Sequence, residues 1–220
     1  MFDVHVVFLG AIIGLSGTAM YARDTFRGVT QPNRVTWFLW FLAPMLAFSV
    51  EIHQGVGLRS TMTLVIGLGP LLVLIASFAN RQSTWKLGPF DVACGIASFG
   101  GLVLWLVTSD DMVALFSFMT ADFLAGLPTI VKSWREPSSE STSAYLTGFI
   151  NALLTLSTVT VWTTAEVAFP IQIVAFNLLE VALIAGRLGP RTRHEPTITM
   201  APPVEHVIAG FRNEAESTDA

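Results

Sequence analysis

The chain has 220 residues, of which 52% are hydrophobic and only 13% are charged, and its formal net charge is −4. A soluble domain carries about 25% charged residues, so the composition excludes an ordinary soluble domain, and it excludes a disordered chain for the same reason. No basic field is large enough to hold a phosphate backbone, so we expect no nucleic-acid partner. The lone cysteine, Cys94, excludes a disulfide framework and a cysteine metal site.

A bilayer core about 30 Å thick requires roughly 20 apolar residues per helix, and the sequence contains seven stretches of this kind. They lie at Val4–Tyr21, Val35–His53, Ser60–Ala79, Pro89–Thr108, Met112–Lys132, Ala144–Thr164 and Ala168–Arg187. The first stretch follows Asp3 instead of basic residues and lacks a cleavage pattern, which favours a retained helix over a secretory signal. Residues 189–220 are rich in Pro, Glu, Arg and Thr, and we expect a disordered tail there.

Cationic residues gather on one side of the predicted membrane, because short cytoplasmic loops retain lysine and arginine. The opposite set of connections contains only Arg59. The basic set is Arg23, Arg27, Arg34, Arg81, Lys86, Lys132, Arg135, Arg187, Arg191 and Arg193. This asymmetry predicts an N-terminus outside and a cytoplasmic C-terminus, in a protein integral to the plasma (inner) membrane.

The two halves of the chain carry a weak internal repeat. Arg27 is followed ten residues later by Trp37, and Arg135 is followed ten residues later by Tyr145, each time after a polar loop. Spans one to three cross the membrane in the same order of directions as spans five to seven, so the fourth span inverts the chain between them. We expect an all-α integral membrane fold with two parallel three-helix bundles, residues 1–79 and 111–188, a linker helix within 80–110, and a cytoplasmic tail at 189–220.

One segment resembles a known family. Leu127-Pro128-Thr129-Ile130-Val131-Lys132-Ser133-Trp134-Arg135 and the Ser138-Ser139-Glu140-Ser141 loop resemble the PQ-loop family of seven-helix membrane proteins, which includes the SWEET sugar transporters. Thr129 stands where that family has glutamine, and Met20-Tyr21 stands where a repeat offset of 108 residues places the first pair.

The resemblance implies transport by two bundles that rock around a central pocket, with prolines as hinges in spans one, two, five and six. Pro44 and Pro128 match two of these hinge positions, whereas spans one and six contain no proline. A proline removes one helical hydrogen bond and allows bending, although membrane helices also tolerate prolines as passive kinks.

Polar side chains at membrane depth are costly and mark candidate sites. Asp122 lies near the middle of span five, and Asn177 and Glu180 share one face of span seven. Each carboxyl must be protonated, hydrogen-bonded or open to water. The resemblance implies that Asn177 contacts the substrate, and interhelical packing is the alternative role for all three residues.

Two further residues complete the predicted substrate site. Asn151 belongs to a polar stripe with Thr155 and Thr158 on span six, which must face protein or water. Trp40 lies one turn deeper than Trp37 and could stack on a sugar ring, or it could anchor the helix at the membrane interface. The histidines have no paired spacing for a metal, so we expect no metal and no cofactor.

These features favour a transporter or facilitator of a small polar solute of the sugar or amino-acid class, with protons as a candidate coupling ion. The alternative is a non-transporting seven-helix receptor or assembly partner, and a homo-oligomer stays open in both cases. No nucleophile lies beside a base at depth, so we expect no enzyme. The last span contains no lysine for a retinal Schiff base, which excludes a photoreceptor.

Overall fold

The computed structural model describes residues 4–53, 55, 60–80, 83 and 85–189, and all regular structure in these residues is helical. The all-α fold class is therefore confirmed. The helices are α1 (Val4–Phe26), α2 (Arg34–His53), α3 (Ser60–Ala79), α4 (Pro89–Val107), α5 (Asp111–Arg135), α6 (Thr142–Ser157) and α7 (Thr164–Gly186), with a 3₁₀ turn, η2 (Pro137–Ser139), before α6. The predicted tail at 189–220 lies outside the described residues from position 190 onward.

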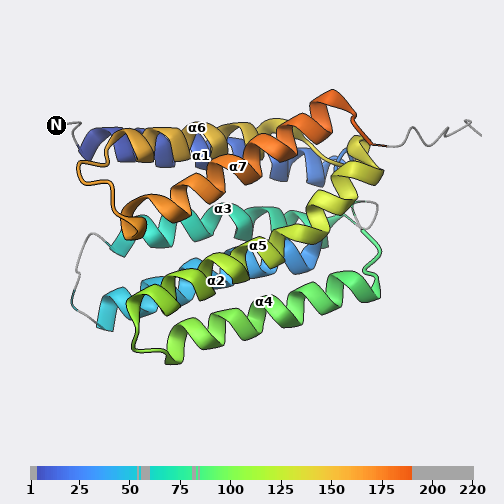
Figure 1. The fold of residues 1–220 in the computed structure, drawn as a ribbon. Coiled ribbons are helices and arrows are strands. Elements are labelled where there is room, and N and C mark those ends of the chain that lie inside the picture. Colours follow the sequence, from blue (N-terminus) through green and yellow to red (C-terminus); the bar gives the residue numbers. More distant parts are fainter. Residues whose placement is uncertain (1–3, 54, 56–59, 81–82, 84, 190–220) are drawn as a thin grey trace, which may run out of the picture. The chain divides into compact units, whose positions relative to one another are not determined.

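We call α1, α2 and α3 the first helix group and α5, α6 and α7 the second, following their order in the chain. In the first group α3 packs against α1 and α2, and in the second group α7 packs against α5 and α6. The groups meet where α1 contacts α6 and where α2 contacts α5, while α4 packs against α5 and α2. Successive helices alternate in direction, so α1, α3, α5 and α7 all run the same way (Figure 1).

The outer surface of the helices is apolar and part of the interior is polar. On α4, Ile96 and Val107 are 70% and 71% exposed, whereas Ser98 is 1% exposed. The Ser98 hydroxyl donates a hydrogen bond of 2.6 Å to the carbonyl oxygen of Ala121 in α5. In water such a surface would be a large exposed apolar patch, but in lipid it is the favourable arrangement.

Three described helices, α4, α5 and α7, are long and apolar enough to cross a membrane. Shorter apolar segments lie in α2 (Arg34–Val50) and α3 (Ile66–Ala79). These helices indicate an integral membrane protein.

Local sequence explains where α4 and α5 begin. Pro89 stands at the first turn of α4, where its missing N–H costs nothing, and Asp91 accepts a hydrogen bond from the backbone N–H of Gly88. Asp110 caps α5 because its carboxylate accepts hydrogen bonds of 2.9 Å from the N–H groups of Met112 and Val113. Aspartate at this end also interacts favourably with the helix dipole.

The predicted sixth span was too long. It was expected to reach Thr164, but α6 ends at Ser157 and residue 164 begins α7. The Thr158 hydroxyl donates to the carbonyl oxygen of Thr155, and the Thr163 side chain caps α7 by accepting from the N–H of Glu166. Threonine side chains compete in this way for backbone partners, so the β-branched segment 158–163 forms a turn although it is apolar enough to extend the helix.

Candidate functional site

A cavity of about 480 Å³ lies between the two helix groups. Side chains from α1, α2, α3, α5, α6 and α7 line it, and none from α4 does. On α5 the lining residues are Phe118 and Asp122, and on α7 they run from Phe169 to Asn177, so the cavity lies toward the ends where α5 and α7 begin. Trp37 and Tyr145 lie near the starts of α2 and α6 and line the opposite end of the cavity, which we call its inner limit.

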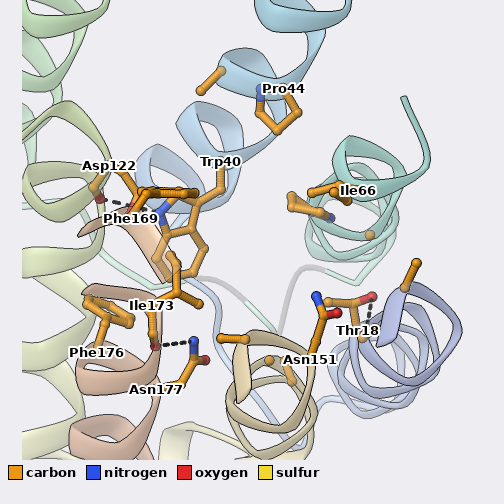
Figure 2. Close-up of a pocket in the computed structure, with 18 of the residues that line it drawn as sticks. Thr18, Trp40, Pro44, Ile66, Asp122, Asn151, Phe169, Ile173, Phe176 and Asn177 are labelled. Carbon is orange, nitrogen blue, oxygen red and sulfur yellow. Dashed lines mark hydrogen bonds between the residues drawn. The ribbon is translucent and has the colours of Figure 1, made fainter. Parts of the chain in front are cut away.

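Aromatic rings build one wall of the cavity, and the candidate residue Trp40 is central to it (Figure 2). Its indole packs edge-to-face against Phe176 with ring centroids 5.5 Å apart, and against Trp37 at 5.4 Å. Its Nε1–H donates a hydrogen bond of 3.4 Å to the carbonyl oxygen of Asp122. These contacts place Trp40 inside the protein and fix the orientation of its ring face.

The two candidate asparagines lie on the cavity wall (Figure 2). The Asn177 amide donates a hydrogen bond of 2.8 Å to the carbonyl oxygen of Ile173, one turn earlier in α7. A Cβ atom at Gly148 of α6 would lie 2.8 Å from its side-chain oxygen. Asn151 packs against Gly14 of α1, where a Cβ atom would lie 3.6 Å from its side-chain nitrogen. Both amides therefore occupy space that a neighbouring glycine leaves open.

Asp122 also lines the cavity, and its carboxylate has a partner. The Gln172 side chain donates hydrogen bonds of 3.1 Å to Asp122 Oδ2 and 2.9 Å to the carbonyl oxygen of Met119. This link ties α7 to α5. One of the two predicted intramembrane carboxyls is thus held by an amide.

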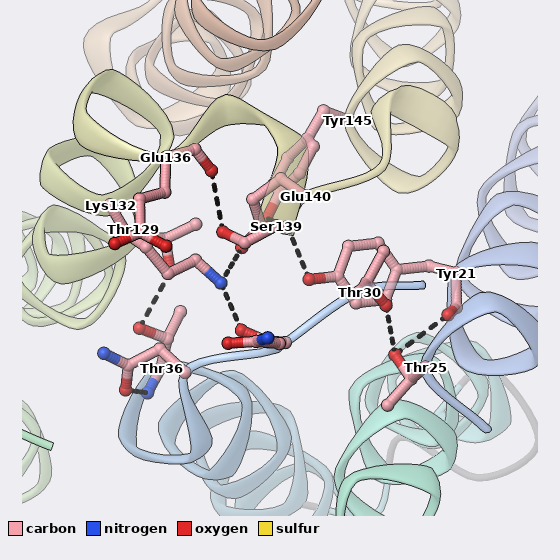
Figure 3. Close-up of polar contacts among 12 residues, drawn as sticks. Tyr21, Thr25, Thr30, Thr36, Thr129, Lys132, Glu136, Ser139, Glu140 and Tyr145 are labelled. Carbon is pink, nitrogen blue, oxygen red and sulfur yellow. Dashed lines mark hydrogen bonds and ion pairs between the residues drawn. The ribbon is translucent and has the colours of Figure 1, made fainter. Parts of the chain in front are cut away.

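A buried polar cluster lies beyond the inner limit of the cavity, at the ends where α1 and α5 finish (Figure 3). Lys132 forms an ion pair with Glu140, and both side chains are fully buried. The Lys132 ammonium also donates to the carbonyl oxygen of Gln31. Glu140 accepts hydrogen bonds from the hydroxyls of Tyr21 and, at 3.2 Å, Tyr145. We call Tyr21, Gln31, Lys132, Glu140 and Tyr145 the closing cluster.

The closing cluster corrects one reading of the sequence. Lys132 was counted among the cationic residues that terminate a span, but α5 continues to Arg135 and keeps Lys132 inside the protein. The chain then folds back through η2, which brings Glu140 to the ammonium. The sequence signal for this ion pair was the presence of opposite charges at Lys132 and Glu140, eight residues apart, with a Pro-Ser-Ser turn between them. The repeat offset of 108 residues marked the position of Tyr21 but not its contact with Glu140, and nothing in the sequence pattern pointed to the backbone of Gln31.

Of the three other predicted residues, Pro44 lines the cavity and Glu180 and Pro128 do not. Glu180 does not line the cavity and is 0% exposed in α7, near the closing cluster. Pro44 lines the cavity from within α2. Pro128 is buried inside α5, in the turn before Lys132. Asn177, Asp122, Asn151 and Trp40 are brought together around one cavity, whereas Glu180 is separate from them.

No group of three or more His, Cys, Asp or Glu side chains that could hold a metal ion occurs in the described part of the chain. No protein-family model, curated protein or solved structure matches this chain. The cavity and the closing cluster are therefore the features from which a function can be inferred.

Proposed function

We propose that this chain is a multi-pass membrane transporter or facilitator of a small polar solute, which works by alternating access between its two three-helix groups. One observation carries the proposal: the cavity is bounded by six helices, three from each group. A solute bound there contacts both groups, so relative movement of the groups could expose it first to one side of the membrane and then to the other.

The contacts at the inner limit of the cavity support the same mechanism. Tyr21 of the first group donates to Glu140 of the second, and Lys132 of the second donates to Gln31 of the first. These contacts seal the end of the cavity where α1 and α5 finish. If the basic residues at this end are cytoplasmic, the structure is an outward-facing state in the plasma (inner) membrane.

The lining favours a small neutral solute of the sugar or amino-acid class. None of the lining residues in the described part of the chain is lysine, arginine or histidine. Asn151 and Asn177 offer amide donors and acceptors, and Trp40 offers a flat face on which a sugar ring or an apolar side chain can stack. A few directed polar groups on apolar walls are typical of small-molecule sites.

The resemblance of the 127–135 segment to the PQ-loop family agrees with this proposal. The offset of 108 residues places Tyr21 opposite Thr129. Tyr21 of α1 bonds to Glu140 just before α6, and Thr129 of α5 bonds to Thr36 in the first turn of α2. Corresponding positions of the two halves therefore make corresponding contacts to the opposite half, as expected for a duplicated carrier.

Uptake into proteoliposomes, screened across radiolabelled sugars and amino acids, tests the proposal. Ala47→Phe fills the cavity from α2 and should abolish uptake of any transported solute. The matched control, Ala97→Phe, adds the same ring to the exposed face of α4, which does not line the cavity, and should leave uptake unchanged. Solute binding without uptake would favour the receptor or assembly partner instead.

A further inference from the structure

Glu180 is a fully buried carboxyl for which the proposed transport cycle has so far no role. It lies in α7, one helical turn beyond the cavity residue Asn177, and is 0% exposed. Neither of its carboxylate oxygens makes a hydrogen bond of normal geometry, and the hydroxyl of Ser133 in α5, the polar group that faces it, makes none either. Asp122, the other predicted intramembrane carboxyl, differs because it accepts a hydrogen bond from Gln172.

The titratable groups that face Glu180 come from α5, α6, α1 and the segment before α6. They are Lys132 of α5, Glu140 before α6, Tyr145 of α6 and Tyr21 of α1. Lys132 is the single cation among them, and its ammonium is already engaged by Glu140 and by the carbonyl oxygen of Gln31. This region therefore contains one positive charge, on Lys132, and two carboxyls, Glu140 in the closing cluster and Glu180 beside it, and only Glu140 is paired with the cation.

These surroundings determine whether the Glu180 carboxyl is ionised or protonated while the closing cluster is formed. Burial of an ionised carboxylate without a cationic partner is strongly unfavourable, and the negative charge of Glu140 makes it more so. The neutral acid avoids both costs. The sealed end therefore accommodates Glu180 with its proton bound.

Separation of the two helix groups would allow Glu180 to ionise. The Tyr21–Glu140 and Lys132–Gln31 contacts both cross between the groups, so both break when the end opens. Lys132, Glu140 and Glu180 all belong to the second group and stay together. Water then reaches Glu180, and Lys132, freed from Gln31, can pair with either carboxylate.

We propose that Glu180 is a proton-binding site linked to closure of this end of the cavity: the proton is bound while the closing cluster is formed and is released to water when it separates. The reaction is the closed state with Glu180–COOH going to the open state with Glu180–COO⁻ plus one proton. Raising the pH therefore favours the open state. The role of this proton in solute transport rests on the proposed function, whereas the linkage itself does not.

A cysteine at the sealed end measures this equilibrium without any substrate. Thr36 is 0% exposed beside the closing cluster, so Thr36→Cys in a Cys94→Ala background should react with a membrane-permeant maleimide only when the end opens. Leu188→Cys, at an exposed position, reports the intrinsic change of thiol reactivity with pH. The ratio of the two labelling rates then follows the fraction of open protein.

We expect this ratio to rise with pH by up to about tenfold per pH unit, because opening releases one proton. Glu180→Gln keeps the shape and cannot ionise, so it should give a low ratio without pH dependence. Glu166→Gln, an exposed carboxyl at the start of the same helix, is the control and should behave as the parent. A pH-independent ratio in the parent, or a pH-dependent ratio in Glu180→Gln, would overturn the proposal.

Hydrogen–deuterium exchange of residues 136–141 provides a second measurement that needs no cysteine. At pH 7.5 exchange in Glu180→Gln should be slower than in the unmodified chain, and equal or faster exchange contradicts the linkage. If the variant does not fold, the pH dependence of labelling in the parent still decides. A pH-dependent ratio in a protein that transports none of the screened solutes would refute the proposed function but leave the linkage intact.

Discussion

The hydroxyl of Thr129 in α5 donates a hydrogen bond of 3.1 Å to the hydroxyl of Thr36 in α2, and both residues are 0% exposed. This bond joins the two helix groups beside the closing cluster. The two hydroxyls therefore make a buried polar contact between α5 and α2.

The Thr129–Thr36 bond should be measurable as a coupling free energy. Thr129→Val keeps the shape but leaves the Thr36 hydroxyl buried without this partner, so we expect a loss of about 1–3 kcal/mol in the free energy of unfolding in detergent micelles. The double variant Thr36→Val with Thr129→Val should lose less than the sum of the two single changes. Strict additivity would show that the two hydroxyls do not interact.

Close packing between α1 and α6 should make Gly17 intolerant of any side chain. A Cβ atom there would lie 2.6 Å from the backbone carbonyl oxygen of Ser143 and would also overlap the Thr147 side chain. Because backbone cannot move aside cheaply, Gly17→Ala should destabilise the fold by about 1–3 kcal/mol through overpacking.

The matched control for this change is Gly100→Ala, because no atom lies within 4 Å of a Cβ at Gly100 in α4. Alanine has the higher helix propensity, so this control should be neutral or stabilising by up to about 1 kcal/mol. Thermal unfolding of both variants in micelles gives the comparison. Equal stability of the two variants would contradict the close approach of α1 and α6.

The sequence predicted the helices better than it predicted their contacts. Apolar length located α2, α3 and α4 to within one residue at each end, because helix existence depends on local composition. The end of α6 was misplaced because the threonines at 158 and 163 bond locally, and apolar content does not report such bonds.

The candidate site was predicted in part for a similar physical reason. Polar residues at membrane depth, such as Asn177 and Asn151, stand out in an apolar sequence, and both line the cavity. Lys132 and Glu140 do not stand out, because charged residues are expected near a span end. Only the fold-back through η2 shows that they are buried together, and this is a tertiary contact that no periodicity contains.

Membrane orientation is the next prediction. The basic bias places the end of α7 in the cytoplasm and the α4–α5 turn outside. In a Cys94→Ala background, Leu188→Cys should resist an impermeant maleimide added to intact cells, whereas Ser109→Cys should be labelled. Both cysteines should react after permeabilisation, which serves as the control. Labelling of Leu188→Cys in intact cells would reverse the predicted topology.

Pro128 should affect transport more than folding if it acts as a hinge. The proline cannot donate a helical hydrogen bond, so Pro128→Ala restores one bond inside α5 and should raise the free energy of unfolding, by at most about 3 kcal/mol. A straighter α5 should favour one access state and slow uptake several-fold. Pro89→Ala, at the first turn of α4, is the control and should change neither quantity much. Normal uptake by Pro128→Ala would identify a passive kink.

The last prediction tests whether the Asn177 amide contacts the substrate or only packs α6 against α7. A Cβ atom at Gly148 would lie 2.8 Å from the Asn177 side-chain oxygen and 3.2 Å from its side-chain nitrogen, so Gly148→Ala must displace this amide within the cavity. The atoms that the new Cβ meets end a rotatable side chain and are not backbone, and alanine favours the helix, so the free energy of unfolding should change by less than about 1 kcal/mol. If the amide contacts the substrate, Gly148→Ala should raise the solute concentration for half-maximal uptake tenfold or more, which corresponds to a loss of about 1.4 kcal/mol in binding free energy.

Asn177→Ala should give a similar rise in that concentration. Adding Gly148→Ala to Asn177→Ala should raise it little further, because both changes act on one amide. If Gly148→Ala and Asn177→Ala both leave uptake unchanged, the amide only packs α6 against α7.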